Sequence, residues 1–166
     1  MSSVKNDKFT LAFFPNAKGF GFAFMQNALT LKDYQIVTSR PISNSTLMNR
    51  IRDYIDYYEP DIVILEDYNY KQSYKSKRVK KLIDTISEYA KTRKIKIVFY
   101  SREQIKFVFS EFNAKTKYEI SKVISENIPK LKKLLKPKHK IWEPEPYAQG
   151  IFDAVSLGIT HYFLAN

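Results

Sequence analysis

The chain has 166 residues and carries 28 Lys and Arg against 17 Asp and Glu, a formal net charge of +11 at pH 7. An apolar fraction of 44%, with 12 Tyr and 12 Phe, excludes a disordered chain, and the length suits one domain. The absence of cysteine excludes disulfides, thiolate zinc sites and cysteine nucleophiles. Because there are two histidines, any catalytic metal would depend on oxygen ligands, which favours Mg²⁺ or Mn²⁺.

The predicted elements follow from the spacing of apolar residues and from turn and capping signals. In chain order they are strands at 9–14, 20–25 and 31–38, a helix at 47–58, a strand at 61–66, a helix at 79–89, a strand at 95–100, and helices at 103–109, 118–128 and 147–164. Short connections between the first strands favour antiparallel pairing, and helical connections between the later strands favour parallel pairing. The sequence therefore predicts an α/β fold with a mixed sheet and helices on both faces.

The basic charge is concentrated in one part of the chain. Residues 71–140 hold 21 Lys and Arg and 6 Asp and Glu, a local net charge of +15, whereas the rest of the chain has a net charge of −4. A concentrated positive field attracts polyanions. This asymmetry favours nucleic acid as the partner, over a lysine-rich surface that is merely well solvated.

The segment 68–78 interleaves tyrosines with basic residues, so that cations can bind phosphates while aromatic rings stack on unpaired bases. Its candidate nucleic-acid-binding residues are Tyr70, Lys71, Lys75, Lys77 and Arg78. The alternative is a solvated loop whose tyrosines pack on the sheet. The basic stretch 130–140 is weaker evidence, because a run of charge is usually a solvated face.

Two acids stand out by their positions. Glu66 ends a strand of nearly continuous apolar residues, at the end where α/β sheets bind ligands. Asp153 interrupts the apolar face of the last predicted helix and needs a partner there. Two carboxylates from separate elements can hold a divalent ion that activates water for phosphodiester cleavage. The alternatives are a capping or loop-bracing role for Glu66 and a buried hydrogen bond or ion pair for Asp153.

Several segments, in the same order along the chain, resemble motifs of the RuvC-like Holliday junction resolvases, a family of the RNase H-like superfamily. The sequence DAVSLGITH at 153–161 is similar to the family's closing helix, and LAFFPNAKGFGFA at 11–23 to its first hairpin. Ile64-Leu65-Glu66 falls where the family's second acid lies. SREQIK at 101–106 ends in Lys106, and AKTKYEI at 114–120 contains Lys117, at positions where family lysines recur.

This resemblance implies a single RNase H-like domain over 1–166, with a five-stranded mixed sheet of three antiparallel and two parallel strands. It also implies a homodimer that acts on branched DNA. In such a protein, Glu66 and Asp153 are expected to hold Mg²⁺ or Mn²⁺ as catalytic carboxylates. Lys106 and Lys117 are expected to bind phosphates of the DNA and to stabilise developing charge as catalytic lysines.

The chain departs from the family's acidic site at two of the four carboxylate positions. Phe14 stands where the first catalytic Asp falls, and Gly150 stands where another acid precedes Asp153 by one turn. A phenyl ring cannot ligate a metal, so Mg²⁺ is expected to bind weakly or to be absent. The candidates to replace the missing acids are Asn16, Asp67, Glu143 and Glu145.

The sequence therefore predicts a RuvC-like protein of DNA recombination that binds Holliday junctions. It leaves open whether the protein is also a Mg²⁺-dependent, structure-selective endonuclease with an atypical site. The alternative is a catalytically inactive RNase H-like module for nucleic-acid binding or scaffolding, and an RNA-directed nuclease or RNA-binding domain is a third option. No segment resembles a targeting signal or is long enough to span a bilayer, so we expect no membrane association and a cytoplasmic location.

Overall fold

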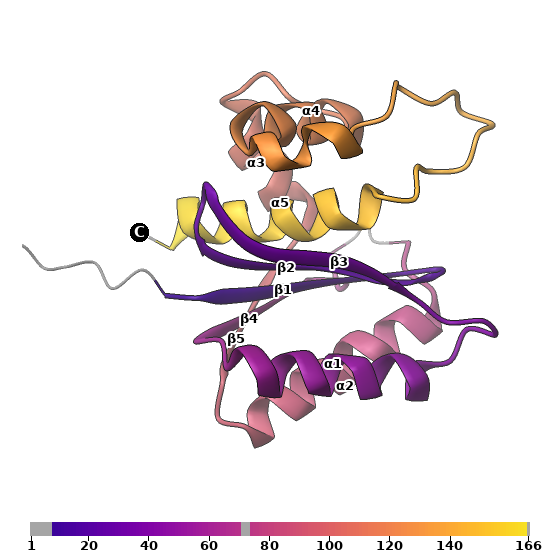
Figure 1. Cartoon of the computed structure of the whole chain (residues 1–166), viewed down its shortest axis with the longest axis vertical. Coiled ribbons are helices and arrows are strands. Elements are labelled where there is room, and N and C mark those ends of the chain that lie inside the picture. The colour runs from indigo at the N-terminus through magenta and orange to yellow at the C-terminus, as the bar shows by residue number, and fades with distance from the viewer. Residues whose placement is uncertain (1–7, 71–73, 166) are drawn as a thin grey trace, which may run out of the picture.

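The computed structural model describes residues 8–70 and 74–165, and its centre is a five-stranded sheet in the order β3-β2-β1-β4-β5 (Figure 1). β1 (Thr10–Asn16) pairs antiparallel with β2 (Gly19–Asn27), which pairs antiparallel with β3 (Thr30–Thr38). On the other side of β1, β4 (Ile62–Glu66) and then β5 (Lys96–Tyr100) are added in parallel. The carboxyl ends of β1, β4 and β5 therefore lie at the same edge of the sheet.

Helices cover both faces of this sheet (Figure 1). α1 (Asn44–Tyr58) and α2 (Lys77–Thr92) pack on one face, and α5 (Gln149–Leu164) lies across the other. Outside α5 lie the remaining helices, which are α3 (Arg102–Ser110), α4 (Lys117–Asn127) and the 3-10 helix η1 (Pro129–Leu134). The predicted fold class, a mixed α/β sheet of three antiparallel and two parallel strands with helices on both faces, is confirmed. Within the described residues, no helix has the length and apolar character needed to cross a membrane.

Alternation along the strands determines which side chains meet at the site. Successive side chains of a strand point to opposite faces. Leu11 and Phe13 of β1 belong to the core beneath α1 and α2, whereas Ala12 and Phe14 belong to the core beneath α5. On β4, Ile62 and Ile64 lie in that second core, and the same alternation places the side chain of Glu66 on the α5 face. Phe14 and Glu66 therefore project from adjacent strands toward the same helix.

Two segments differ from the sequence prediction. β1 continues through Pro15 to Asn16, because the Asn16 carboxamide oxygen accepts hydrogen bonds from the backbone of Lys18 and Gly19 and closes a tight hairpin. The first part of the basic stretch 130–140 lies in the 3-10 helix η1, which spans Pro129–Leu134. Leu131 within it is fully buried, so this part of the stretch is not simply a solvated face.

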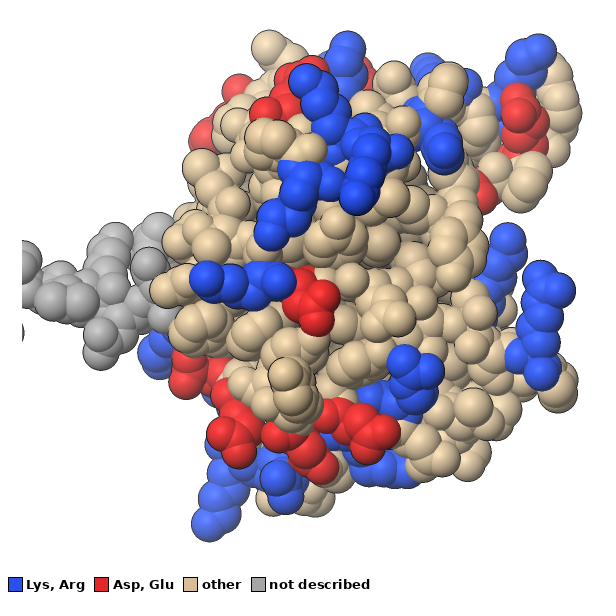
Figure 2. Space-filling model, in the orientation of Figure 1, with Lys and Arg blue, Asp and Glu red and all other residues tan. Residues whose placement is uncertain are grey.

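Charge is unevenly spread over the face shown in Figure 2. Basic side chains gather over the upper layer, which holds α3, α4 and η1, and at the right-hand end of the molecule. Acidic side chains gather at the lower left, near the end of α1. Part of the basic charge of residues 71–140 therefore lies over the layer above α5.

Candidate functional site

A pocket of about 270 Å³ opens at the edge where β1 and β4 end. It is lined by Phe14, Glu66, Asp67, Tyr70, Tyr74, Lys75, Arg102 and Lys117. Three helices begin around it, since Lys75 directly precedes the N-cap of α2, Arg102 is the first residue of α3 and Lys117 is the first residue of α4. The position agrees with the general rule that open α/β sheets bind ligands outside the carboxyl ends of their strands.

The two acids predicted from the sequence are both buried here, with side chains 7% exposed. Burial raises the pKa of Glu66 above its usual value, and the charge of Asp153 adds to this shift, while Lys75 opposes it. Burial likewise raises the pKa of Asp153, against Lys117 and a hydrogen bond that Gln149 Nε2 donates to Asp153 Oδ1 over 3.0 Å. Because the charge of Asp153 contributes to the shift at Glu66, the fold has brought the two carboxylates into the same region of the molecule.

Each buried carboxylate has its own lysine. Lys75 Nζ lies 3.4 Å from Glu66 Oε2, and Lys117 Nζ lies 3.5 Å from Asp153 Oδ2. Lys117 Nζ also donates to Glu145 Oε1 at 3.1 Å. Burial lowers the pKa of Lys117, but Asp153 and Glu145 outweigh that effect and the net shift is upward. Both ammonium groups therefore favour the ionised forms of the acids beside them.

Phe14 lies between these two ion pairs. Its ring is buried, and Lys75 Nζ stands 4.0 Å from the ring centroid, while Lys117 Nζ stands 5.7 Å from it. The face of an aromatic ring attracts cations through its quadrupole. Phe14, at the position of the family's first acid, thus makes cation-π contacts with both lysines.

Gly150 also has a structural reason to lack a carboxylate. A Cβ at Gly150 would lie 3.0 Å from Ile36 Cδ1 and 3.2 Å from Asn16 Nδ2, and Gly150 itself is in contact with Gly21 of β2. α5 approaches the sheet so closely at this point that a side chain has little room. This close approach positions Asp153, one turn further along α5.

Of the proposed replacements for the missing acids, Glu145 is the one that contacts a site lysine. Asp67 lines the pocket, but its side chain accepts from the backbone of Asn69. Asn16 holds the β1-β2 hairpin, and Glu143 accepts from the backbone of Lys140. Among the described residues, no group of three or more His, Cys, Asp or Glu is arranged to hold a metal ion. The residues present therefore do not fit a two-metal centre.

The predicted nucleic-acid-binding residues do not all lie at the pocket. Tyr70, Lys75 and Lys117 line the pocket. Lys77 is exposed on the first turn of α2, and Lys106 is half-buried on α3 outside the pocket lining.

Two further predicted residues have other positions. The Arg78 guanidinium donates to the Asn16 carbonyl oxygen at 2.6 Å and to Asn44 Oδ1 at 2.8 Å, so it fixes the β1-β2 hairpin against α1. Lys71 lies outside the described residues. Sequence reasoning did not single out Arg102 and Tyr74, which line the pocket. Their signal was present, because Arg102 directly follows the helix-capping Ser101 and Tyr74 lies in the aromatic-basic segment.

Comparison with known proteins supports the resemblance through structure. No protein-family model and no curated protein sequence matches the chain. RuvC of Thermus thermophilus, solved in complex with a Holliday junction substrate, matches with a TM-score of 0.68 at 16% identity, covering 95% of this chain and 94% of that one. A second structure of Thermus thermophilus RuvC matches with a TM-score of 0.65 at 15% identity, over 95% of each chain.

The yeast mitochondrial Holliday junction resolvase Ydc2 matches with a TM-score of 0.57 at 12% identity, covering 97% of this chain and 81% of that one. These matches extend over nearly the whole chain and share its sheet and helices. The chain therefore has the fold of the RuvC Holliday junction resolvases, as the sequence resemblance predicted.

Proposed function

We propose that this protein binds branched DNA at the pocket formed by the ends of β1 and β4, and that it holds a junction without cutting it by a two-metal reaction. The observation that carries this proposal is the pairing of each buried carboxylate with a lysine in a fold that matches a RuvC bound to a Holliday junction. The basic side chains that line the pocket suit a phosphate group, whereas Glu66 and Asp153 are already paired with lysines. The protein would then act as a pseudo-resolvase.

Helix starts around the pocket support an anionic ligand. The N-caps of α2, α3 and α4 are Ser76, Ser101 and Thr116, each of which accepts a backbone hydrogen bond. The positive end of a helix dipole favours anions and disfavours cations. Nevertheless Lys77, Arg78, Arg102 and Lys117 occupy first-turn positions. A DNA phosphate bound at this end would relieve the resulting repulsion.

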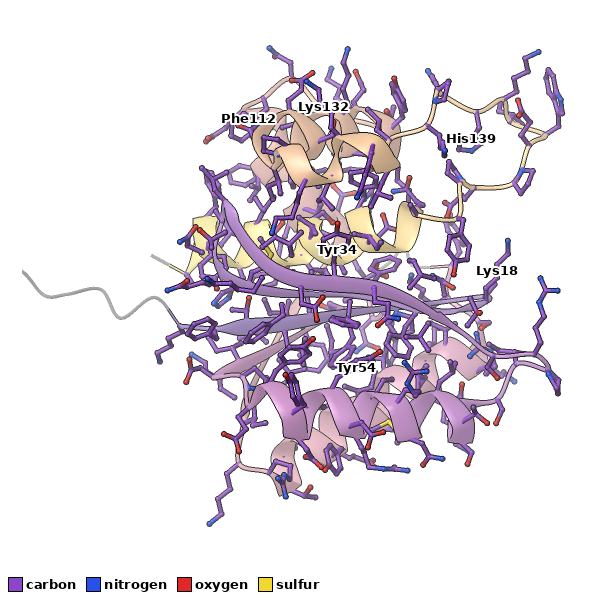
Figure 3. All side chains as sticks on the ribbon, viewed as in Figure 1. Lys18, Tyr34, Tyr54, Phe112, Lys132 and His139 are labelled. Carbon is purple, nitrogen blue, oxygen red and sulfur yellow. The ribbon has the colours of Figure 1, made fainter. Side chains whose placement is uncertain are left out.

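Exposed aromatic residues, one of them in the pocket lining, support contact with unpaired bases. Tyr74 lines the pocket and is 93% exposed. The segment between η1 and α5 projects from the molecule, and it places His139 at the same end as Lys18 of the β1-β2 hairpin (Figures 1 and 3). Trp142 on this segment is 78% exposed, and Lys140 Nζ lies 5.2 Å from the centroid of its ring. Aromatic platforms beside cations are typical of surfaces that bind single-stranded nucleic acid.

The homodimer stays a prediction. A two-fold dimer would present two copies of the pocket to a four-way junction, because closed symmetry repeats the same surface on each subunit. Sedimentation of the protein with a junction would test this directly. Two chains per junction are expected, and one chain per junction would contradict it.

The test of the function uses purified protein with a labelled four-way junction and a linear duplex of the same sequence. Binding and cutting are measured together in Mg²⁺ and then in Mn²⁺, for the wild-type chain and for Glu66→Gln and Asp153→Asn. We expect the junction to be bound more tightly than the duplex and to stay intact. Competition with a structured RNA measures whether the protein prefers DNA or RNA. We expect the RNA not to displace the junction at equal concentration.

Each other result has a defined meaning. Cutting that both substitutions abolish would show a working metal site and a Mg²⁺-dependent endonuclease. Equal affinity for junction and duplex would remove the branched-DNA proposal. Displacement of the junction by RNA at equal concentration would identify an RNA-binding domain.

A further inference from the structure

We propose that Lys75 and Lys117 serve as fixed cations in this site, so that their ammonium groups balance Glu66 and Asp153 where a nuclease of the two-metal type uses divalent ions. The inference rests on the proposed function for its role in DNA binding. Its structural part concerns the free protein and stands on the geometry of four residues. In this proposal Lys75, which precedes α2, determines whether the site binds a cation or an anion.

The two ion pairs have the geometry this role requires. Lys75 Nζ reaches Glu66 Oε2 at 3.4 Å and Lys117 Nζ reaches Asp153 Oδ2 at 3.5 Å. The lysine side chains are 19% and 38% exposed, so each cation lies between a buried acid and the open pocket. A buried carboxylate without a counter-charge is strongly unfavourable, and these lysines supply that charge within the chain itself.

Phe14 completes the arrangement. A carboxylate at this position would add a third negative charge and favour a divalent ion, as two-metal sites require. The ring instead places its face within 4.0 Å of Lys75 Nζ and 5.7 Å of Lys117 Nζ. A phenyl ring attracts an ammonium group without presenting an oxygen ligand. The same substitution that removes a metal ligand therefore stabilises the lysines that replace the metal.

A divalent ion would have to displace both lysines before it could reach the acids. Mg²⁺ prefers several anionic oxygens and gives up its waters reluctantly. Among the described residues, the acids of the site do not form a group of three that could hold a metal ion. The pocket is therefore built to accept an anion, a backbone phosphate, beside Lys75, Lys117 and Arg102, with no metal as intermediary.

The first experiment uses the free wild-type protein and Mn²⁺ as the probe. Mn²⁺ binding is measured by electron paramagnetic resonance, and the melting temperature is measured with and without millimolar Mn²⁺. We expect no bound Mn²⁺ and no change in melting temperature. Mn²⁺ that binds the wild-type chain, and is lost in Glu66→Gln or Asp153→Asn, would overturn the proposal.

The second experiment is a double-mutant cycle of urea unfolding with Lys75→Met, Glu66→Gln and the pair together. Since each single change leaves one charge of the ion pair without its partner, we expect the double variant to lose less stability than the sum of the singles. Lys122→Met, an exposed lysine of α4, is the matched control and should add independently to Glu66→Gln. Additive losses for Lys75→Met and Glu66→Gln would also overturn the proposal.

A third measurement connects the site to DNA. Junction affinity in EDTA should equal that in Mg²⁺ at matched ionic strength, and Lys75→Met should reduce the slope of log affinity against log salt by about one. An unchanged slope, or affinity that requires Mg²⁺, would contradict the phosphate role. If the protein shows no junction preference, the proposed function fails by itself, because the Mn²⁺ and unfolding measurements do not involve DNA.

Discussion

Gly21 of β2 and Gly150 of α5 are in direct backbone contact, so that a Cβ built on Gly21 would lie 2.2 Å from the Gly150 carbonyl oxygen. This contact sets how deeply the amino-terminal end of α5 sits on the sheet. Asp153 follows Gly150 by one helical turn and is buried beside Lys117. The approach of two glycines thereby determines where one acid of the site lies.

Gly21→Ala is expected to destabilise the protein by about 2 kcal/mol or more, because rigid backbone must move to admit the methyl group. Gly150→Ala is expected to cost less, since its new Cβ meets the end of the Ile36 side chain at 3.0 Å. Urea unfolding of the two variants measures the difference. A Gly150→Ala variant less stable than Gly21→Ala would show that the interface does not depend on the β2 backbone.

Arg78 is expected to stabilise the protein by holding the β1-β2 hairpin against α1. Arg78→Lys removes the planar fork that reaches both the Asn16 carbonyl and Asn44 Oδ1, and should destabilise the chain by about 1–3 kcal/mol. Lys77→Met, at the exposed neighbouring position, should change stability by less than about 0.5 kcal/mol. Equal unfolding curves for wild type and Arg78→Lys would contradict a bracing role.

His161 is expected to make stability depend on pH. His161 Nδ1 lies 2.7 Å from the Tyr100 hydroxyl, and burial lowers the pKa of the imidazole below its usual 6.5, with Lys96 and Lys8 adding to the shift. The unfolded chain therefore takes up a proton first as pH falls. Stability contributed by the neutral ring should be lost as pH drops from about 6.5 toward the lower folded pKa.

His161→Asn isolates this effect, because its amide oxygen can accept from Tyr100 but does not titrate. The free energy of unfolding of wild type and variant is compared between pH 7.5 and pH 5. We expect the wild-type curve to fall more steeply than the variant curve over this range. Parallel curves would mean that protonation of His161 is not linked to folding.

Tyr74 is expected to contribute to junction binding and not to stability. Stacking of one base on an aromatic side chain contributes about 1–3 kcal/mol, so Tyr74→Ala should weaken junction affinity by about fivefold or more. Its unfolding free energy should stay within about 0.5 kcal/mol of wild type, because the residue is 93% exposed. Tyr57→Ala, an exposed tyrosine of α1, is the control and should leave affinity unchanged. An equal loss in both variants would exclude stacking by Tyr74.

The order of strands and helices follows from local pattern, and the structure confirms it. Continuous apolar residues in β4 and helical spacing in α5 are recorded in the sequence itself, so the two embedded acids, Glu66 and Asp153, were visible as exceptions within them. The ordered resemblance added Lys117 and the expected fold. The strand and helix patterns are properties of single segments and the resemblance is an ordered set of such segments, so one sequence sufficed to predict both.

What the sequence left open was decided by contacts between distant segments. The sequence predicted Lys75 as a nucleic-acid-binding residue, but its contacts with Glu66 and with the ring of Phe14 are visible only in the tertiary structure. Glu145 reached Lys117 from a segment 28 residues away, whereas Asp67 engaged its own loop. Such partners depend on strand register and on how closely α5 packs at Gly21, and local pattern does not encode either. The sequence thus identified the two acids and the two lysines of the site, whereas tertiary packing decided which lysine is paired with which acid.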